Sequence, residues 1–210
     1  MWRVIGIDVG YSHLAAVVCD VDKDDYKINV VFSKMTDLRR YSCKDSNCMF
    51  EKWDRKAGHL VHHYVEDMSG WFSTADQIVI EAQPIMSTHK DVEQLLLVYI
   101  KQRFSVPLNK PKNHVKLIAP QSMHYHFNMA SSKEDRRREI VGITHEYLSE
   151  QQEFKNADQK DHLADAMGFI IYYVKVLMPS VMIKMKPNPF ERFKFDPEDQ
   201  KTTPKQGSFC

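Results

Sequence analysis

Hydrophobic residues near the N-terminus occur in short runs interrupted by polar residues, a pattern typical of β-strands. Three runs rich in β-branched residues cover residues 2–9, 13–21 and 26–35. The acidic tetrapeptide 22–25 separates the last two runs, so we expect these two strands to form a hairpin. The chain is therefore predicted to open with a three-stranded antiparallel meander.

Beyond the polar residues 36–48, short apolar strands alternate with segments of helical periodicity. Two apolar runs, each closed by a proline, predict further strands over 76–84 and 114–120. In the other segments apolar residues recur every three to four positions, which predicts amphipathic helices. These predicted helices cover residues 49–71, 90–104, 132–151 and 160–178.

The predicted order is three strands, helix, strand, helix, strand and then two helices. This order gives an α/β protein with a mixed five-stranded sheet flanked by helices, and it matches the RNase H-like fold. A length of 210 residues suits one such domain with an appendage. We assign residues 1–180 to the domain, and residues 181–210 to a C-terminal tail that we expect to be partly disordered. Because unrelated activities share this fold, the function must be argued from the site.

Composition and charge narrow the class of protein. A net charge of +1 excludes a uniformly basic protein but allows a local basic patch that a nucleic acid would meet. No stretch reaches the roughly 18 apolar residues of a membrane span, and the N-terminus does not read as a secretory leader. The four cysteines do not form a disulfide framework. We therefore expect an intracellular protein in a reducing environment, without membrane contact.

Carboxylates stand at the ends of two predicted strands. Asp8 ends the first apolar run, in VIGIDVGYSH, and Glu81 ends the run in IVIEAQP. If these two strands are parallel neighbours, both side chains lie at the carboxyl edge of the sheet, where open α/β sheets bind ligands. An Asp at a strand end is by itself an ordinary turn former. A Glu that ends a buried strand is less common, because buried Glu is rare unless it is paired.

A third polar group lies on the predicted helix 160–178. Asp161, His162 and Asp165 are spaced so that they share one helical face, and the opposite face is apolar. Clustered carboxylates repel one another unless a cation neutralises them, and hard oxygen ligands favour Mg²⁺ or Mn²⁺. Two such ions ~4 Å apart can activate a water and stabilise the leaving oxygen of a phosphodiester. The three acidic segments together predict a metal-dependent phosphodiesterase site.

Four motifs give the chain a resemblance to a known family. They are IGIDVGYSH, IVIEAQP, HVKLIAPQSM and DHLADAMG, and with the helices between them they span residues 3–178. The sequence resembles the RuvC-like Holliday junction resolvases of the RNase H-like superfamily, and most of all the branch found in poxviruses and other large DNA viruses. The first motif also opens actin-like ATPases, so the second and fourth motifs carry the resemblance.

The resemblance implies a structure-selective endonuclease that acts as a homodimer on four-way and other branched DNA. It implies paired nicks on strands of like polarity, leaving 5′-phosphate and 3′-hydroxyl ends, in DNA recombination and repair or in the resolution of viral genome concatemers. It further implies two Mg²⁺ ions per active site, for which Mn²⁺ substitutes, and no nucleotide cofactor. A viral protein of this kind is expected in the host cytoplasm or in viral replication factories, with a nuclear phase left open.

The resemblance also assigns roles to residues. By position, the metal ligands are Asp8, Glu81 and Asp165. The family usually has Asp three residues before the last ligand, and some bacterial members have His there. This chain has His162 at that position with Asp161 beside it, so both are kept as candidates for the fourth ligand. Lys133, near the start of the preceding helix, is the candidate to hold the scissile phosphate.

Basic and aromatic segments supply candidates for DNA contact. Residues 101–117 contain lysines and arginines and no acid, so they could follow phosphates, with a solvated loop as the alternative. The segment KEDRRRE mixes charges at helical spacing, and part of it is expected to be self-paired. Residues 122–129, SMHYHFNM, could stack on unpaired bases, although core packing is favoured. The predicted DNA-binding residues are Lys110, Lys112, Lys116, Arg136 and Arg137.

The sequence also allows other interpretations. Cys43 and Cys48, followed by His59, His62 and His63, are residue types that suit Zn²⁺, but their spacing is unusual, and loop cysteines with helix-surface histidines are favoured. A sugar-kinase-like or actin-like ATPase would need two such domains. A junction-binding protein without cleavage activity, and a related nuclease with broader specificity for branched DNA, are the main alternative functions.

Overall fold

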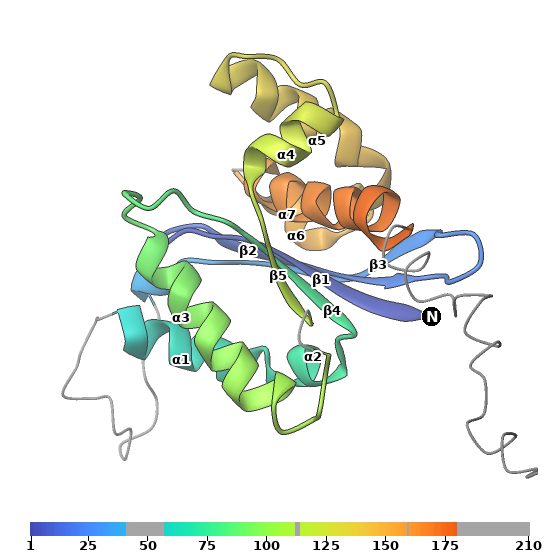
Figure 1. Cartoon of the computed structure of the whole chain (residues 1–210). Coiled ribbons are helices and arrows are strands. Elements are labelled where there is room, and N and C mark those ends of the chain that lie inside the picture. Colours follow the sequence, from blue (N-terminus) through green and yellow to red (C-terminus); the bar gives the residue numbers. More distant parts are fainter. Residues whose placement is uncertain (41–56, 112–113, 159, 180–210) are drawn as a thin grey trace, which may run out of the picture.

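A mixed five-stranded sheet forms the centre of the computed structural model, which describes residues 1–40, 57–111, 114–158 and 160–179 (Figure 1). The strand order across the sheet is β3-β2-β1-β4-β5. The first three strands pair antiparallel, whereas β4 and β5 run parallel to β1. The strands are β1 (Trp2–Asp8), β2 (Leu14–Val21), β3 (Ile28–Thr36), β4 (Gln77–Glu81) and β5 (Val115–Ile118).

The register of β1 and β4 shows that these two strands are parallel neighbours, which is the condition for their terminal acids to meet. Ile7 lies opposite Ile80 in the ladder, so the two strands end level with one another. The next residue of each strand is a carboxylate, Asp8 in β1 and Glu81 in β4. The sheet therefore brings together two acids that are far apart in the sequence.

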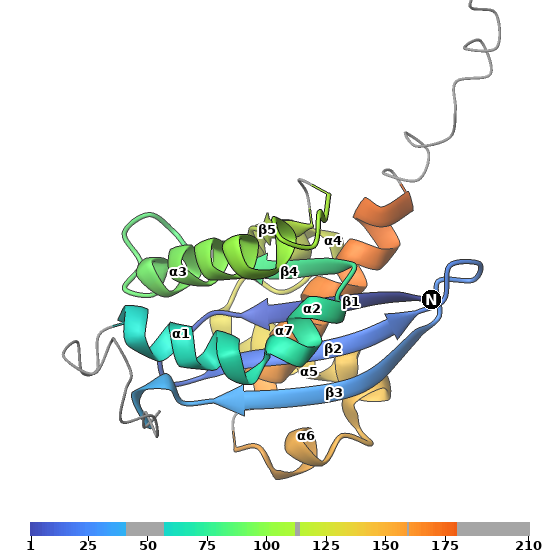
Figure 2. The ribbon, with the colours of Figure 1, turned by 90° about the horizontal axis from the view of Figure 1, so that it is seen from below.

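One face of the sheet is covered by the helices that follow β3 and β4 (Figure 2). They are α1 (Ala57–Asp67), α2 (Ser69–Thr74) and α3 (Lys90–Ile100), which continues into the π-helical turn η3 (Lys101–Ser105). Ile5 and Ile7 of β1 point into this layer and pack with residues such as Tyr64 and Leu96. Of the predicted helix 49–71, residues 49–56 lie outside the described residues, and the rest is divided at the buried Met68.

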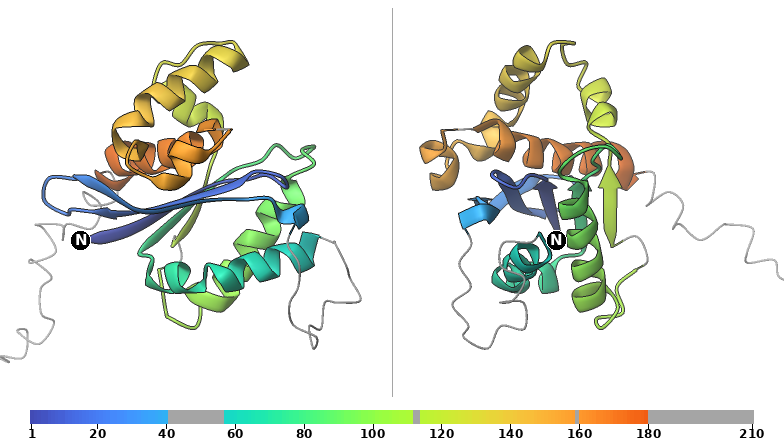
Figure 3. Two further views of the ribbon diagram at one scale, coloured as in Figure 1. Left: turned by 180° about the vertical axis from the view of Figure 1, so that it is seen from behind. Right: turned by 90° about the vertical axis from the view of Figure 1, so that its left-hand side faces the viewer.

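The other face is covered by helices from the C-terminal half of the described chain (Figure 3). They are α4 (Pro120–His126), α5 (Lys133–Leu148), α6 (Gln152–Asn156) and α7 (Lys160–Tyr172), which continues into the π-helical turn η4 (Tyr173–Leu177). Val4 of β1 and Val17 of β2 point to this side and pack with Ala166 and Ile170. Successive side chains of β1 therefore supply two separate cores, as expected for a sheet covered on both faces.

Gly6 allows α7 to lie directly against β1. A Cβ atom at this position would lie 2.2 Å from the carbonyl oxygen of Ala166, a distance that no side chain can occupy. The absence of a side chain therefore sets the spacing between strand and helix. Because Asp165 adjoins Ala166, this contact also sets how closely the acids of α7 approach the end of β1.

The predicted α/β fold with a mixed five-stranded sheet is confirmed. Two short helices, α4 and α6, were not predicted as separate elements, because segments of seven and five residues are too short to show a helical period. The predicted tail 181–210 lies outside the described residues. In the described part of the chain, no helix is both long and apolar enough to cross a membrane.

Candidate active site

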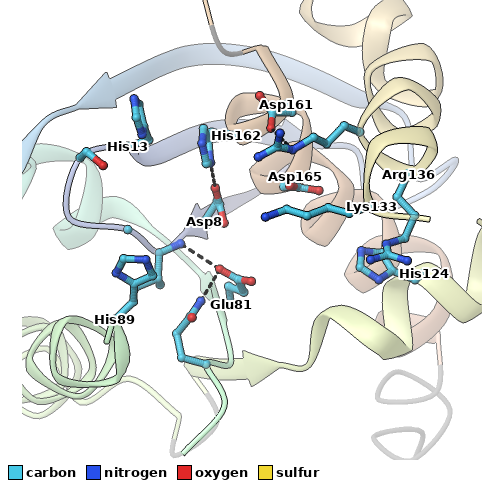
Figure 4. Close-up of a pocket in the computed structure, with 15 residues that line it drawn as sticks. Asp8, His13, Glu81, His89, His124, Lys133, Arg136, Asp161, His162 and Asp165 are labelled. Carbon is cyan, nitrogen blue, oxygen red and sulfur yellow. Dashed lines mark hydrogen bonds and ion pairs between the residues drawn. The ribbon is translucent and has the colours of Figure 1, made fainter. Parts of the chain in front are cut away.

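A pocket with a volume of about 320 Å³ opens at the carboxyl ends of β1 and β4 (Figure 4). Its walls come from the loop after β1, the segment between β4 and α3, and helices α4, α5 and α7. All the residues predicted to be catalytic line this pocket: Asp8, Glu81, Lys133, Asp161, His162 and Asp165. Five separate parts of the sequence thus meet at one point.

Asp8 and Glu81 form the floor of the pocket. Asp8 is 6% exposed, because its position at the end of a central strand leaves it covered by neighbouring elements. Glu81 accepts a hydrogen bond from the backbone N–H of Val9 at 3.1 Å, so the residue after Asp8 is tied to the acid of the adjacent strand. The Gln83 side-chain amide donates a further hydrogen bond to the same oxygen of Glu81, Oε2.

The first turns of α7 contribute His162 and Asp165. The ring atom Nδ1 of His162 lies 2.7 Å from Oδ2 of Asp8, and this hydrogen bond joins α7 to β1. The ring of His13, in the loop after β1, stacks on the ring of His162, with centroids 4.9 Å apart and planes 5° from parallel. His162 is thus fixed both by its bond to Asp8 and by the face of its ring.

Asp161 and His162 occupy different surroundings, although the sequence leaves both open as the fourth ligand. Asp161 pairs with Arg137 of α5, with 3.0 Å between Arg137 Nε and Asp161 Oδ2. His162 instead faces Asp8 directly. In this arrangement His162 is the better placed of the two to act with Asp8, and Asp161 is neutralised by an arginine.

The three inner carboxyl groups resist ionising together. Burial is the main cause in each case: it raises the pKa of Asp8 to about 8, and with the nearby Asp8 it raises the pKa of Glu81 to about 9. Burial and the charges of Glu81 and Asp161 raise the pKa of Asp165 to about 7. The pocket therefore gathers more negative charge than the surrounding protein neutralises.

A divalent cation would supply the positive charge that this excess of negative charge lacks. The donor set of carboxylate oxygens with one imidazole suits Mg²⁺ or Mn²⁺. Asp8, Glu81, Asp165 and His162 are the residues that would hold it. Among the described residues, no group of three or more His, Cys, Asp or Glu side chains is already gathered tightly enough for a metal ion. The donors fit the ion in chemical type.

Basic side chains approach the pocket from α5. Ser132 caps this helix by accepting a hydrogen bond from the backbone N–H of Asp135, which places Lys133 at the first helical position. Lys133 reaches into the pocket toward Asp8 and Asp165 (Figure 4). Arg136 and Arg137 also line it, and Arg136 lies beside His124 of α4. These cations stand where an anionic substrate would approach the acids.

The other predicted DNA-binding residues lie away from this pocket. Lys110 donates a hydrogen bond to the carbonyl oxygen of Ala75, just before β4 begins, so it lies at the opposite end of the sheet. Lys116 lies within β5, opposite Val79 of β4. Lys112 falls outside the described residues. DNA contact by these lysines stays a prediction, and it would require a surface separate from the pocket.

Several pocket residues were not predicted as site residues: His13, Gln83, His89 and His124. His13 and Gln83 follow the two strand-end acids closely, in motifs that the sequence already singles out. His124 belongs to the segment 122–129, in which Met123 is buried and Tyr125 is 91% exposed, so that segment both packs in the core and faces outward. For His13 and Gln83, closeness in the sequence to a predicted acid was the signal that could have identified them as site residues.

The predicted alternative of a zinc site cannot be followed in full. Cys43 and Cys48 lie outside the described residues. His59, His62 and His63 lie on α1 with neighbouring rings in contact, and His59 is buried rather than on the helix surface as expected.

Comparison with known proteins finds similarity only in three dimensions: no protein-family model and no curated protein sequence matches the chain. The fowlpox virus resolvase, solved with Holliday junction DNA, is 14% identical, with a TM-score of 0.54 over 84% of this chain and 99% of that one. Thermus thermophilus RuvC is 16% identical, with a TM-score of 0.56 over 84% and 96%. The yeast mitochondrial Holliday junction resolvase is 18% identical, with a TM-score of 0.56 over 82% and 79%.

At these identities the comparison establishes the fold. The chain has the RNase H-like fold of these resolvases over most of its length and most of theirs. The RNase H-like fold expected from the sequence is thereby confirmed. Activity has to be argued from the pocket itself.

Proposed function

We propose that the protein is a structure-selective endonuclease that resolves four-way DNA junctions by paired, metal-dependent hydrolysis of phosphodiesters. The observation that carries the proposal is the meeting of Asp8, Glu81 and Asp165 in one pocket, with Lys133 directed toward them. The pocket combines acids that favour a divalent cation with basic groups that favour a phosphate. The similar fold of resolvases, one of them solved with Holliday junction DNA, supports this choice of substrate.

In the proposed reaction, the chain's own residues position the substrate and compensate charge. Lys133 binds a non-bridging oxygen of the scissile phosphate, and Arg136 is placed to neutralise an adjacent phosphate. His162 holds Asp8 in one orientation through its Nδ1 hydrogen bond. Bound Mg²⁺ ions would supply an activated water and stabilise the anionic transition state. Cleavage of the bond to the 3′ oxygen leaves a 5′-phosphate and a 3′-hydroxyl.

Paired nicks require two copies of this pocket. A four-way junction has two strands of like polarity in equivalent positions, and both must be cut for resolution. Each chain supplies one copy of the pocket built on Asp8, Glu81 and Asp165, so we propose that a homodimer presents two such pockets to one junction. This arrangement would also make the enzyme selective for the branch, because a linear duplex offers no second equivalent strand.

The test is cleavage of an end-labelled synthetic four-way junction, with a linear duplex of the same sequence, in Mg²⁺ and in EDTA. The wild-type protein is expected to make symmetric, Mg²⁺-dependent nicks in the junction alone. Asp8→Asn should lose cleavage, by at least about 10³-fold if the cations supply some 4 kcal/mol of stabilisation. Asp24→Asn, in the exposed β2–β3 turn, is the matched control.

The result also separates the alternatives. Tight junction binding without cleavage in Mg²⁺ or Mn²⁺ would favour a binding protein. Cleavage of forks and flaps as fast as four-way junctions would favour a nuclease of broader branched-DNA specificity. Undiminished cleavage by Asp8→Asn would remove Asp8 from the site and refute the mechanism.

A further inference from the structure

Gln83 lies two residues after Glu81, and each of its polar groups takes part in a hydrogen bond. Its backbone N–H donates to Oε2 of Glu93, and its carbonyl oxygen accepts from Lys90 Nζ at 3.1 Å. Its side-chain Oε1 accepts from the Ser87 hydroxyl at 3.0 Å, while Nε2 donates to Glu81 Oε2. The side chain is thus held in the one orientation that presents an N–H donor to Glu81.

The partner that holds the Gln83 backbone is a buried carboxylate. Glu93, on α3, is 1% exposed, although an isolated buried carboxylate is strongly unfavourable. Lys90, one helical turn earlier, donates to both of its oxygens at 2.8 and 2.9 Å. Neither residue of the pair lines the pocket. Both residues of the pair bond to the backbone of Gln83, which connects them to the active site.

Glu81 accepts hydrogen bonds from one backbone N–H and one side-chain N–H, and both bonds go to the same oxygen. Val9 and Gln83 each donate to Oε2. These two bonds restrain the rotation of the carboxylate, and Glu81 also shares a hydrogen bond with the carboxyl group of Asp8. Partners of this kind commonly orient a metal ligand and raise its effective affinity.

We propose that Gln83 is a positioning residue that orients Glu81 for metal binding, and that the ion pair between Lys90 and the buried Glu93 holds Gln83 in place. The inference rests on the proposed metal site and names the residues that tune it. It predicts a graded effect: loss of the Gln83 amide weakens metal binding without removing any ligand.

The experiment measures Mn²⁺ binding to the DNA-free protein by electron paramagnetic resonance, and separately the Mn²⁺ and Mg²⁺ dependence of junction cleavage. Gln83→Ala is expected to weaken Mn²⁺ binding about 10-fold. Gln83→Met should weaken it to a similar degree, because it keeps the length of the side chain but has no N–H donor for Glu81. Gln94→Ala, an exposed glutamine on α3, is the matched control and should bind like wild type.

Junction cleavage should show the same weakening of metal binding. With Gln83→Ala, the metal concentration for half-maximal rate should rise about 10-fold, while the rate at saturating metal falls by less than about 3-fold. Junction affinity in EDTA should stay unchanged. A loosened fold would instead lower the rate at every metal concentration, and the melting temperature of each variant identifies that case.

A double-mutant cycle tests the role of the pair. Glu93→Gln removes the charge, and if it acts through Gln83 its effect on Mn²⁺ binding should largely disappear in the Gln83→Ala background. Additive effects would overturn the coupling, and an unchanged Mn²⁺ affinity in Gln83→Ala would overturn the positioning role. If the wild type and Asp8→Asn bind Mn²⁺ equally weakly, the metal centre itself is refuted, and with it this inference.

Discussion

His162 Nδ1 and Asp8 Oδ2 lie 2.7 Å apart, although the two residues are 154 positions apart in the sequence. This hydrogen bond joins the first strand of the sheet to the helix that closes the described domain. It also gives the two neighbouring candidates on α7 separate partners, because Asp161 is paired with Arg137. Substitution of each residue can therefore test whether Asp161 or His162 is the fourth ligand.

His162→Ala is expected to reduce junction cleavage about 100-fold, because Asp8 loses its orienting partner and the site loses a donor. His162→Asp should retain most activity in Mg²⁺, since a carboxylate at that position is a hard ligand. Asp161→Asn should change the rate by less than about 3-fold, because its charge is already balanced by Arg137. Single-turnover cleavage of the four-way junction measures all three. The reverse ranking of Asp161→Asn and His162→Ala would make Asp161 the fourth ligand.

The stability of the metal-free protein should fall as pH rises from about 5 to 9. Burial raises the pKa of Asp8 to about 8, of Glu81 to about 9 and of Asp165 to about 7. Between the ordinary carboxyl pKa and these values the folded state binds more protons than the unfolded state, so its stabilisation is lost with rising pH. Mg²⁺ competes with these protons, so its own stabilising effect should grow over the same range.

Thermal melts at several pH values, in EDTA and in Mg²⁺, measure this competition. Asp165→Asn should flatten the pH dependence in EDTA, because one of the buried titrating groups is removed. A melting temperature in EDTA that rises with pH would contradict the excess of negative charge inferred for the pocket.

Gly6→Ala should destabilise the protein by about 1–3 kcal/mol, because the new methyl group collides with the Ala166 carbonyl and forces α7 away from β1. Cleavage should fall as well, since the same displacement separates His162 and Asp165 from Asp8. Gly142→Ala is the matched control: it lies within α5 with nothing within 4 Å of the added Cβ. This change should stabilise the helix by up to about 1 kcal/mol. Urea unfolding of both variants gives the comparison.

Lys133→Ala is expected to lower the cleavage rate about 10²-fold with little change in junction affinity, because its ammonium group compensates charge that develops during the reaction. Lys133→Arg should recover part of the rate by keeping the charge at a similar reach. Arg138→Ala, on the same helix but outside the pocket, serves as the control. An equal loss of rate in both alanine variants would mean that general surface charge, rather than Lys133, is responsible.

The strands and the acids could be predicted because each produces a recognisable local pattern of apolar and polar residues. Asp8 and Glu81 both interrupt apolar runs, and Asp165 lies on the polar side of an otherwise buried helix. His13 and His89 interrupt no apolar run, because loops rather than strands bring them to the pocket. The path of the first loop depends on contacts such as the hydrogen bond from the Tyr11 hydroxyl to Asp91 at the start of α3.

The position of the basic segment before β5 could not be predicted from the sequence, for a different reason. Its charge is visible in the sequence, but charge alone does not give its position on the sheet. Because β5 runs parallel to β4, the residues that lead into β5 enter at the edge opposite Glu81, and Lys110 accordingly bonds near the start of β4. Topology, rather than composition, decides which basic residues meet the pocket.

The contact between α7 and β1 has a consequence for the order in which the protein becomes active during its synthesis. The ribosome produces Asp8 and Glu81 long before His162 and Asp165, so a nascent chain that ends before α7 lacks two of the four candidate ligands. The same chain leaves Val4 and Val17 without the helix that covers them. The proposed nuclease site and the burial of this face therefore form together, when α7 docks on the sheet.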